Sequence, residues 1–544
     1  MAANTTFITH PPFDVLSTTA LYLRGRLANS TLTSAQIIQA YLDQIHRHNT
    51  SGAKLNLIVS LRDREELLDE ARERDEELAA GKSRGVFHGI PFIAKDAFAT
   101  APDFGLPTTT LYEKNSYVRH CCALLRPIQL ISAGMILMGK SNLSEFCGCK
   151  GNVGWSAVGG QGQSPYVPGG QGQSPYVPGG LKERDPPRGP TAPGGSSTGS
   201  AHGVAAGFSP IAIGTETCGS LITPAGRAGV YTLKITPGAA NADGICKITV
   251  AWNTIGAFAK TVHEVAVVTG LLLQRGKAAT ADNTLANHLR KDFTGLRIGF
   301  VDPDLWAIED DAKEADPSFP GEIKAQFEWA MKAMRDLGGQ VVYPVEIPAH
   351  ETFFHKREPL LGSITNAEVK ISLNEYLQSL ENSTVKTLDE LIAFNKQNSD
   401  LELPPGNTGQ EGLIAAAEST VKPEDLSFLR DLFYSKAGKD GVEKTIRQHN
   451  LDVIVAPVDS PVQSVSTSSM TPAATVPLGY AKINGHPFGA QLLGLPNTEP
   501  KLIEVMSAWE AMFPSRRTPD LSWAEPGQAS GLHVQGCGQS DVDS

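Results

Sequence analysis

The stretch GGSSTGSAHGVAAGFSPIAIGTETCGS, residues 194–220, contains two glycine–serine turns separated by a run of small residues. Stretches rich in glycine and serine are most often solvated connectors between folded elements. A connector needs no particular neighbours in the chain, whereas a catalytic serine loop needs a base and a rigid support. The segments that surround residues 194–220 therefore decide between these two interpretations.

The whole chain has the size and composition of a globular protein. It has 544 residues, of which 41% are hydrophobic, and a formal net charge of −11. A chain of this length usually forms two or three domains, although a large α/β enzyme can build one continuous sheet. The negative charge argues against nucleic-acid binding, which normally requires a basic surface.

The sequence also indicates the cellular location of the protein and the chemistry of its cysteines. The first residues, MAANTTFITHPP, lack the basic and apolar regions of a signal peptide. No apolar run reaches the length of about 18 residues that a membrane helix needs, so we expect a soluble cytoplasmic protein. Seven cysteines are too few for a disulfide scaffold, and Cys147 and Cys149 have no second Cys/His pair nearby to complete a zinc site.

Hydrophobic periodicity predicts an α/β organisation. Amphipathic helices are predicted at residues 34–46, 62–80 and 321–339. Apolar runs predict strands at residues 88–96, 296–301, 340–347 and 451–458, and a hairpin turns at Asn484–Gly485. The succession of strand, helix and strand between residues 296 and 347 indicates a βαβ unit and thus a partly parallel sheet. Thr33 and Gln36 are placed to form a capping box.

One ten-residue sequence is duplicated. GQGQSPYVPG occurs at residues 160–169 and again, identically, at 170–179. Two copies rich in glycine and proline have no alternating core pattern, so we expect added loop that buries little surface. The connection from 151 to 193 is then unusually long, which is typical of functional surface loops, and its end leads into the first serine turn.

The chain contains the patterns of two other kinds of serine enzyme. Gly195-Ser196-Ser197-Thr198-Gly199 matches the nucleophile elbow of α/β-hydrolases, with Ser197 as nucleophile. That elbow needs a strand running directly into it, and the preceding RDPPRGPTAP contains four prolines. The Ser-x-x-Lys pattern of penicillin-recognising enzymes occurs three times, at Ser51, Ser383 and Ser419, without the motifs that should accompany it.

A third pattern joins residues 194–220 to an upstream segment, HGIPFIAKD (88–96), in which Lys95 ends an apolar run. Together they resemble the amidase signature family, whose motifs read Gly-Gly-Ser-Ser-Gly-Gly-Ser, Gly-Thr-Asp-x-Gly-Gly-Ser and Gly-x-Pro-x-x-x-Lys-Asp. The 24-residue step from Ser196 to Ser220 agrees with that family, and the resemblance extends over residues 12–515. The chain looks most like fungal amidases related to the A subunit of glutamyl-tRNA amidotransferase.

The resemblance implies a single large α/β domain, a mixed central β-sheet flanked by helices, over residues 1–520, with a flexible tail at 521–544. It implies a Ser–Ser–Lys triad in which Lys95 is the base, Ser196 the bridge and Ser220 the nucleophile. A cis peptide is implied between Gly195 and Ser196. The backbone N–H groups implied for the oxyanion hole belong to Thr217, Cys218, Gly219 and Ser220, and the supporting residues are Gly194, Gly195, Ser197 and Thr215.

Elementary chemistry agrees with these roles. A serine hydroxyl is a weak nucleophile until a base takes its proton. An ordinary lysine, with a pKa of about 10.4, is protonated at neutral pH and is no base, but desolvation lowers that pKa by several units. Pro91, Phe92, Ile93 and Ala94 place Lys95 in apolar surroundings. Asp96 would stabilise the ammonium, yet alternation along an extended segment directs it to the opposite face, so we expect no direct pair.

The chain departs from the family pattern near the nucleophile. Cys218 stands where the family has a second glycine, Ile222 where it usually has arginine, and Glu216 where aspartate is common. Residues 232–236 read Thr-Leu-Lys-Ile-Thr instead of Gly-Leu-Lys-Pro-Thr. Loss of the arginine removes a charge and a fork of hydrogen-bond donors close to the second turn.

The function implied is hydrolysis of a carboxylic amide through an acyl-enzyme on Ser220. Two alternatives stay open: an amidotransferase A-type subunit with glutaminase activity, or a catalytically impaired pseudo-amidase that acts as a binding protein. No metal or cofactor is implied, because lysine and serines supply the chemistry. The expected partner is a small-molecule amide, with no nucleic acid and no membrane, and a homodimer is possible.

Overall fold

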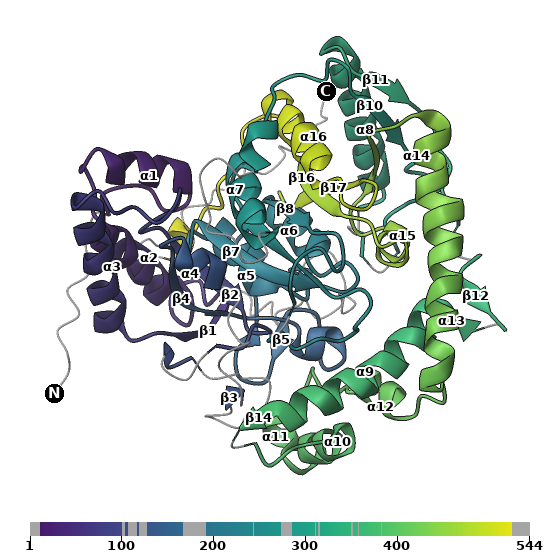
Figure 1. The fold of residues 1–544 in the computed structure, drawn as a ribbon, viewed down its shortest axis with the longest axis horizontal. Helices are drawn as coiled ribbons and strands as arrows, with labels where there is room; N and C mark the ends of the chain where they lie inside the picture. The colour runs from purple at the N-terminus through teal and green to yellow at the C-terminus, as the bar shows by residue number, and fades with distance from the viewer. Residues whose placement is uncertain are drawn as a thin grey trace, which may run out of the picture.

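The computed structural model describes residues 11–524, with gaps at 101–103, 107–116, 119–127, 167–191, 243, 274–284, 311, 314–315, 350–351, 357 and 382. Its centre is one sheet of 11 strands in a three-layer arrangement with helices (Figure 1). From one edge to the other the strands are β1 (Ile58–Leu61), β4 (Ile136–Ser141), β2 (Pro91–Lys95), β7 (Ile211–Glu216), β9 (Thr254–Ala259), β8 (Tyr231–Lys234), β16 (Ala473–Tyr480), β17 (Pro487–Leu493), β15 (Val453–Pro457), β10 (Arg297–Phe300) and β11 (Gln340–Val342).

The sheet is mixed, as predicted. Strands β4, β2 and β7 are mutually parallel, and so are β15, β10 and β11 at the other end. Antiparallel pairs join these two groups through β9, β8, β16 and β17. The single α/β domain with a mixed central sheet is therefore confirmed. The carboxyl ends of β2 and β7, which carry Lys95 and the 216–220 turn, lie at the same edge because these strands run parallel.

Most elements predicted from periodicity form where expected. Helix α2 (Ser34–His48) begins with the capping box of Thr33 and Gln36, and α3 (Arg64–Ala79) follows it. Helix α8 (Phe319–Asp336) connects the parallel strands β10 and β11, which confirms the βαβ unit. The remaining helices around the sheet are α1 (Ala20–Ala28), α4 (Ile128–Ser132), α5 (Thr198–Ala205), α6 (Ile222–Ala228), α7 (Val262–Leu273), α15 (Val462–Ser468) and α16 (Glu499–Met512).

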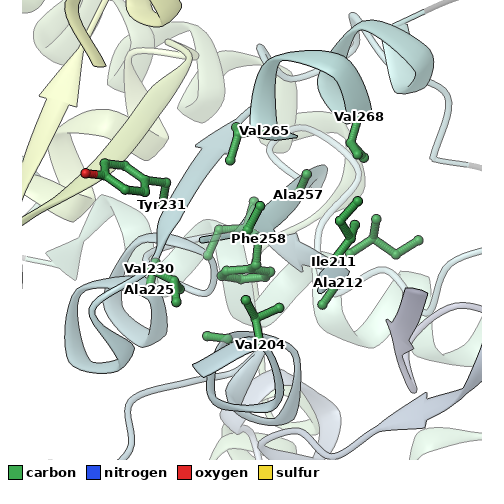
Figure 2. Close-up of a cluster of buried hydrophobic side chains, with 14 of the residues drawn as sticks. Val204, Ile211, Ala212, Ala225, Val230, Tyr231, Ala257, Phe258, Val265 and Val268 are labelled. Atoms are coloured by element: carbon green, nitrogen blue, oxygen red, sulfur yellow. The ribbon is translucent and has the colours of Figure 1, made fainter. Parts of the chain in front are cut away.

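Helices α5 and α7 cover opposite faces of the sheet at β9. Figure 2 shows Val204 of α5 beneath the ring of Phe258, while Val265 and Val268 of α7 lie above Ala257. Alternation along β9 sends these two neighbouring side chains to opposite faces. A Cβ added to Gly199 in α5 would lie 2.3 Å from the carbonyl oxygen of Leu57, so only glycine permits this close approach. The run of small residues between the two serine turns therefore forms a helix that packs closely against neighbouring backbone.

A helical segment between β11 and β15 was not predicted from the sequence. In Figure 1 it runs in green along one side of the molecule and beneath the sheet. It consists of α9 (Leu360–Ser379), α10 (Leu388–Gln397), α11 (Ser399–Glu402), α12 (Glu411–Ala417), α13 (Pro423–Tyr434) and α14 (Glu443–His449). We call it the helical arm. Phe433 and Ile364 of the arm belong to a second hydrophobic cluster that also contains Ile454 of β15.

The expectations for the loop and the tail need correction in part. Gln161 and Ser164 of the first duplicated copy are buried, and β6 (Gly160–Gln161) pairs with β5 (Trp155–Ser156). The first copy is thus packed structure as far as residue 166, because its polar groups bond to neighbouring backbone. The second copy, 170–179, lies outside the described residues. Leu521 is buried, so packing continues past residue 520, and 525–544 lies outside the described residues.

Three two-stranded sheets complete the described structure. Besides β5 and β6, they pair β3 (Tyr117–Val118) with β14 (Leu380–Glu381) and β12 (Phe354–His355) with β13 (Glu358–Pro359). The pairing of β3 with β14 joins the end of α9 to the segment that follows β2. Within the described ranges, no helix has both the length and the apolar character needed to cross a membrane.

Candidate active site

Lys95 is the last residue of β2, and its side chain is fully buried. Its Nζ lies 2.6 Å from Ser196 Oγ and 2.9 Å from Thr215 Oγ1. Burial lowers the pKa of Lys95 below its ordinary value, and the nearby Cys147, Cys246 and Glu216 oppose that shift only in part. Nζ also lies 3.4 Å from the carbonyl oxygen of Thr215, so its oxygen partners are two hydroxyls and one carbonyl, none of which carries the negative charge of a carboxylate.

The two serines complete a continuous chain of polar atoms from Lys95. Ser196 Oγ lies 3.0 Å from Ser220 Oγ. The peptide bond between Gly195 and Ser196 is cis, as the resemblance implies. Ser196 is 2% exposed and Ser220 is 6% exposed, so only the last hydroxyl of the chain approaches the surface of the site. The three residues predicted to act together are thus brought together.

Asp96 follows Lys95 directly and is also buried, yet it faces elsewhere. Its Oδ1 lies 3.2 Å from Nζ of Lys140, the buried lysine on the neighbouring strand β4. Lys140 also donates to the carbonyl oxygen of Phe98 at 2.6 Å. The expectation that Asp96 does not pair with Lys95 is confirmed, because the alternation of the strand separates the two side chains.

Ser197 and Thr215 support the site through buried hydrogen bonds. The Ser197 hydroxyl donates to the carbonyl of Thr215 at 3.1 Å, and its backbone N–H donates to the carbonyl of Ser220 at 3.1 Å. Ser197 is fully buried at the start of α5, and its Oγ is directed into the protein. This position does not suit the nucleophile elbow, whose serine must stand exposed above the sheet.

The carboxylate of Glu216 holds the turn of residues 217–220 through hydrogen bonds to the backbone that follows it. Its Oε2 accepts hydrogen bonds from the N–H groups of Leu221 and Ile222 at 2.7 and 3.1 Å, and Nζ of Lys234 lies 3.7 Å from its Oε1. Gly219 has φ +76°, a left-handed conformation that favours glycine. The N–H groups of Gly219 and Ser220 have no acceptor among the described residues.

Gly194 and Gly195 are needed for close packing. Gly194 has φ +72°, and a Cβ on Gly195 would lie 2.3 Å from Ser144 Oγ. The backbone N–H of Ser144 donates to the carbonyl of Ser196 at 3.1 Å. Ser144 lies in the segment that follows β4, so this contact ties the serine loop to that segment.

A pocket of about 310 Å³ opens beside the two turns. Its lining residues are Val153, Ala192, Gly194, Gly195, Cys218, Thr223, Arg227, Glu309, Leu361, Asp459, Ser460, Pro461, Gln463 and Ser464. We call it the catalytic pocket. Gly195 adjoins Ser196, and Cys218 lies two residues before Ser220, so the pocket is lined by the two turns that carry these serines.

Arg227 is a pocket residue that the sequence analysis missed. It lies on α6, which begins directly after Ser220, and its side chain is only 4% exposed. The guanidinium donates to Asp459 Oδ2 at 3.0 Å, to the carbonyl of Ala192 at 2.8 Å and to that of Ala312 at 3.3 Å. One cation thereby joins Ala192 and Asp459, two lining residues of the catalytic pocket, to the neighbouring segment at Ala312. Arg227 lies seven residues after Ser220 and belongs to none of the sequence motifs described above. The sequence alone does not show that its side chain is buried.

Ile222 shows what replaces the expected arginine. Its side chain is fully buried in the second hydrophobic cluster, together with Trp252 and Val462. This departure therefore exchanges a charged group for a core contact, and the guanidinium of the pocket comes from Arg227 instead.

The described cysteines, Cys147, Cys149, Cys218 and Cys246, form no disulfide with one another. Cys147 Sγ lies 4.0 Å from Nζ of Lys95. Burial raises the pKa of Cys149 to about 12, which makes its thiolate scarce at neutral pH. Across the described residues, no three His, Cys, Asp or Glu side chains converge as metal ligands do.

A buried charge cluster also escaped the sequence analysis. Lys150 lies between Glu145, at 3.3 Å, and Glu402 of the helical arm. Burial raises the pKa of Glu145 to about 7, although Lys150 opposes the shift. The cluster ties the segment that begins at Ser144 to the helical arm, and no motif of either segment indicates the contact, because 252 residues separate Lys150 from Glu402.

Comparisons with known proteins agree with this geometry. The amidase family model matches residues 36–463. A probable amidase of Arabidopsis thaliana is 26% identical over 93% of this chain and 92% of its own length. The A subunit of the glutamyl-tRNA(Gln) amidotransferase of Heliobacterium modesticaldum is 25% identical over 92% and 98%. The crystal structure of native peptide amidase from Stenotrophomonas maltophilia has a TM-score of 0.78 and 30% identity, covering 94% of this chain and all of that one.

The family match spans most of the chain, and the similarity to the peptide amidase covers nearly the whole fold. Both agree with the single α/β domain and the mixed sheet described above. The chain therefore belongs to the amidase family, whose members are hydrolases acting on carbon–nitrogen amide bonds.

Proposed function

We propose that this chain hydrolyses a carboxylic amide through an acyl-enzyme on Ser220, with Ser196 and Lys95 as proton relay. The observation that carries the proposal is the unbroken chain of short contacts, 2.6 Å from Lys95 to Ser196 and 3.0 Å from Ser196 to Ser220. Hydroxyl hydrogens rotate freely, so this chain can transmit a proton in either direction.

In the first step, Ser220 Oγ forms a bond to the amide carbonyl carbon. Its proton passes to Ser196 Oγ, while the proton of Ser196 passes to the neutral amine of Lys95. The lowered pKa of Lys95 favours the neutral amine that this step requires. The carbonyl oxygen gains negative charge and is stabilised by the backbone N–H groups of the 217–220 turn, where each donor contributes about 3–4 kcal/mol.

In the second step, the carbon–nitrogen bond breaks and the relay returns its proton to the leaving ammonia or amine. Water then attacks the acyl carbon and gives its proton to the same relay. The carboxylic acid leaves, and Ser220 regains its hydroxyl hydrogen. Gln463 donates to Thr223 Oγ1 at 2.6 Å and packs above Gly219, so it holds the pocket wall beside the reacting carbonyl.

Among the open alternatives, no described feature specifically favours the amidotransferase subunit. The binding-protein alternative predicts an unreactive Ser220. The extent of the domain, a homodimer and a cytoplasmic location stay predictions from the sequence.

The test is labelling with a fluorophosphonate probe, which bonds to an activated serine. Mass spectrometry of the labelled peptide is expected to place the probe on Ser220, and Ser220→Ala protein is expected to stay unlabelled. Ser197→Ala provides the matched control, because it removes a neighbouring buried hydroxyl while leaving Ser220 in place. Folded wild-type protein without any labelled serine would refute the proposal and support the binding protein.

A further inference from the structure

A second cavity lies beside the catalytic pocket. Its volume is about 450 Å³, and its lining residues are Asp302, Leu305, Trp306, Pro344, Val345, Glu346, Ile347, Ala349 and Pro461. Pro461 lines both spaces. The loop between β10 and α8 also reaches both, since Leu305 and Trp306 line the second cavity while Glu309 lines the catalytic pocket. The two spaces are therefore adjacent parts of one surface.

The walls of the second cavity are mainly apolar. Trp306, Val345 and Ile347 are at most 8% exposed, so their positions are held by the core. Leu305 has 81% of its surface exposed, which is the largest exposure of any large hydrophobic side chain described. An apolar ligand group that enters the cavity would cover this leucine and gain the free energy of its burial.

The charged groups of the second cavity all have one sign. Asp302 and Glu346 contribute carboxylates, and no lysine or arginine lines the space. Neither carboxylate forms an ion pair with another described residue. Lys324 pairs with Asp304 and interacts with Asp302 only at longer range, and Asp302 Oδ1 accepts the backbone N–H of Asp304 at 2.9 Å. In the catalytic pocket, by contrast, the carboxylate of Asp459 is already matched by Arg227. A cationic ligand group would therefore find unmatched partners at this end.

We infer that the second cavity is a subsite for the distal end of an elongated amide substrate, and that this end carries an alkylammonium or guanidinium group. The inference rests on the proposed function, since it takes the catalytic pocket as the place of the reacting amide. A lysine-like side chain has an apolar stem and a charged head, which matches apolar walls beside carboxylates. Trp306 also lines the cavity, and an aromatic ring attracts a cation that reaches its face.

The overall charge of the protein supports the same preference. With a net charge of −11, the molecule attracts cations, and a cleft lined by one sign of charge concentrates the complementary ligand. Such an effect weakens with salt, because the Debye length falls to about 3 Å at 1 M. A preference that arises from hydrophobic contact alone would not weaken in this way.

The experiment uses acetylated alanine peptides that end in a carboxamide and contain one lysine two, three or four residues before it. Peptides with Nε-acetyl-lysine at the same position are the uncharged controls. Ammonia release gives kcat/KM for each peptide at low and high salt. We expect lysine to be preferred at one position by about fivefold for each carboxylate, the size of a partly exposed charge pair, and the preference to shrink in 1 M salt.

The variants assign the preference to the cavity. In Asp302→Asn/Glu346→Gln protein the lysine peptide should lose its advantage, whereas Asp310→Asn should keep it. Asp310 is a matched control because it removes a charge from the same loop without lining either space, and its side chain is 94% exposed. A lysine preference that is absent at every position, or that persists in the double variant, would overturn the inference.

Calorimetry measures the binding of the same peptides to Ser220→Ala protein. It therefore tests the subsite without hydrolysis of the peptide. If the wild type hydrolyses acetyl-alaninamide through Ser220 but shows no lysine preference, the subsite is refuted and the proposed function stands. If lysine peptides bind preferentially to the Ser220→Ala protein and no amide is hydrolysed by the wild type, the proposed function is refuted, and the preference of the cavity for a cationic ligand group stands without it.

Discussion

Lys95 and Lys140 lie on the neighbouring parallel strands β2 and β4, and both are fully buried. Burial lowers the pKa of each below its ordinary value. Their partners differ. Lys140 faces the carboxylate of Asp96 at 3.2 Å, which favours its ammonium, whereas Lys95 faces the hydroxyls of Ser196 and Thr215. The comparison shows that burial alone does not decide the role of a lysine, since the charge of its partner does.

The largest effect is expected from replacing Ser220, the proposed nucleophile. Ser220→Ala should lower kcat by about 10,000-fold or more, because acylation loses its nucleophile. Circular dichroism and the melting temperature should stay those of the wild type, since the hydroxyl is at the edge of the pocket. If Ser220→Ala kept its activity while Ser197→Ala lost it, the nucleophile elbow would be the correct interpretation.

Replacing the base itself comes next. Lys95→Met should reduce kcat by about 1,000-fold, within the range that general-base catalysis contributes. Its free energy of unfolding should not fall, because methionine fills the space without a charge to bury. Partial recovery of activity at high pH is expected if hydroxide takes the proton. A folded Lys95→Met protein with wild-type kcat would remove Lys95 from the mechanism.

Lys140→Met should produce the opposite pattern. It leaves the Asp96 carboxylate buried without its cation, which should cost about 3–5 kcal/mol of unfolding free energy in denaturant titration. Asp96→Leu/Lys140→Met should recover much of that loss, because both charges are then absent. Equal stability of the single and double variants would show that the pair is not what holds the two strands together.

The pH profile tests which lysine is neutral. Since the mechanism needs uncharged Lys95, kcat/KM should fall tenfold per unit of acidification below the pKa of that group, which lies below 10.5. The sign follows because a base loses function when it gains a proton. In Thr215→Val protein the pH at which kcat/KM begins to fall should change, because the hydroxyl beside Lys95 Nζ is lost. A rate that is independent of pH across the neutral range would place the Lys95 pKa elsewhere.

The smallest effect is expected from replacing Thr215, whose hydroxyl contacts Lys95. Thr215→Val removes the hydroxyl 2.9 Å from Nζ but keeps the shape of the side chain. The loss of one hydrogen bond should lower kcat by about tenfold with KM unchanged. A change in KM instead would assign Thr215 to substrate binding.

Several parts of this site could be predicted from the sequence because they depend on local patterns. The resemblance to the amidase signature motifs located Lys95, Ser196 and Ser220, and alternation along β2 separated Asp96 from Lys95. Amphipathic periodicity located α2 and α8. These features follow from neighbouring residues, for which the periods of helix and strand set the geometry.

Other parts depend on contacts between distant segments. Arg227 reaches Asp459 across 232 residues, and Lys150 reaches Glu402 across 252. The helical arm shows no motif that indicates its position, and the packing of the first duplicated copy contradicts its loop-like composition. Tertiary contacts override local preference in such cases, because burial and hydrogen bonding at a distance outweigh the small free energies of propensity.

The sequence by itself determined the family, the α/β class and the identity of the three residues in the polar chain, because each is written in short motifs or local periodicity. Only the tertiary structure decided that Lys95 has hydroxyl partners while Lys140 has a carboxylate, that Arg227 joins two walls of the catalytic pocket, and that an acidic cavity adjoins it. The physical reason is that pKa and pocket shape depend on the groups that folding brings within a few ångströms, and those groups come from all parts of the chain.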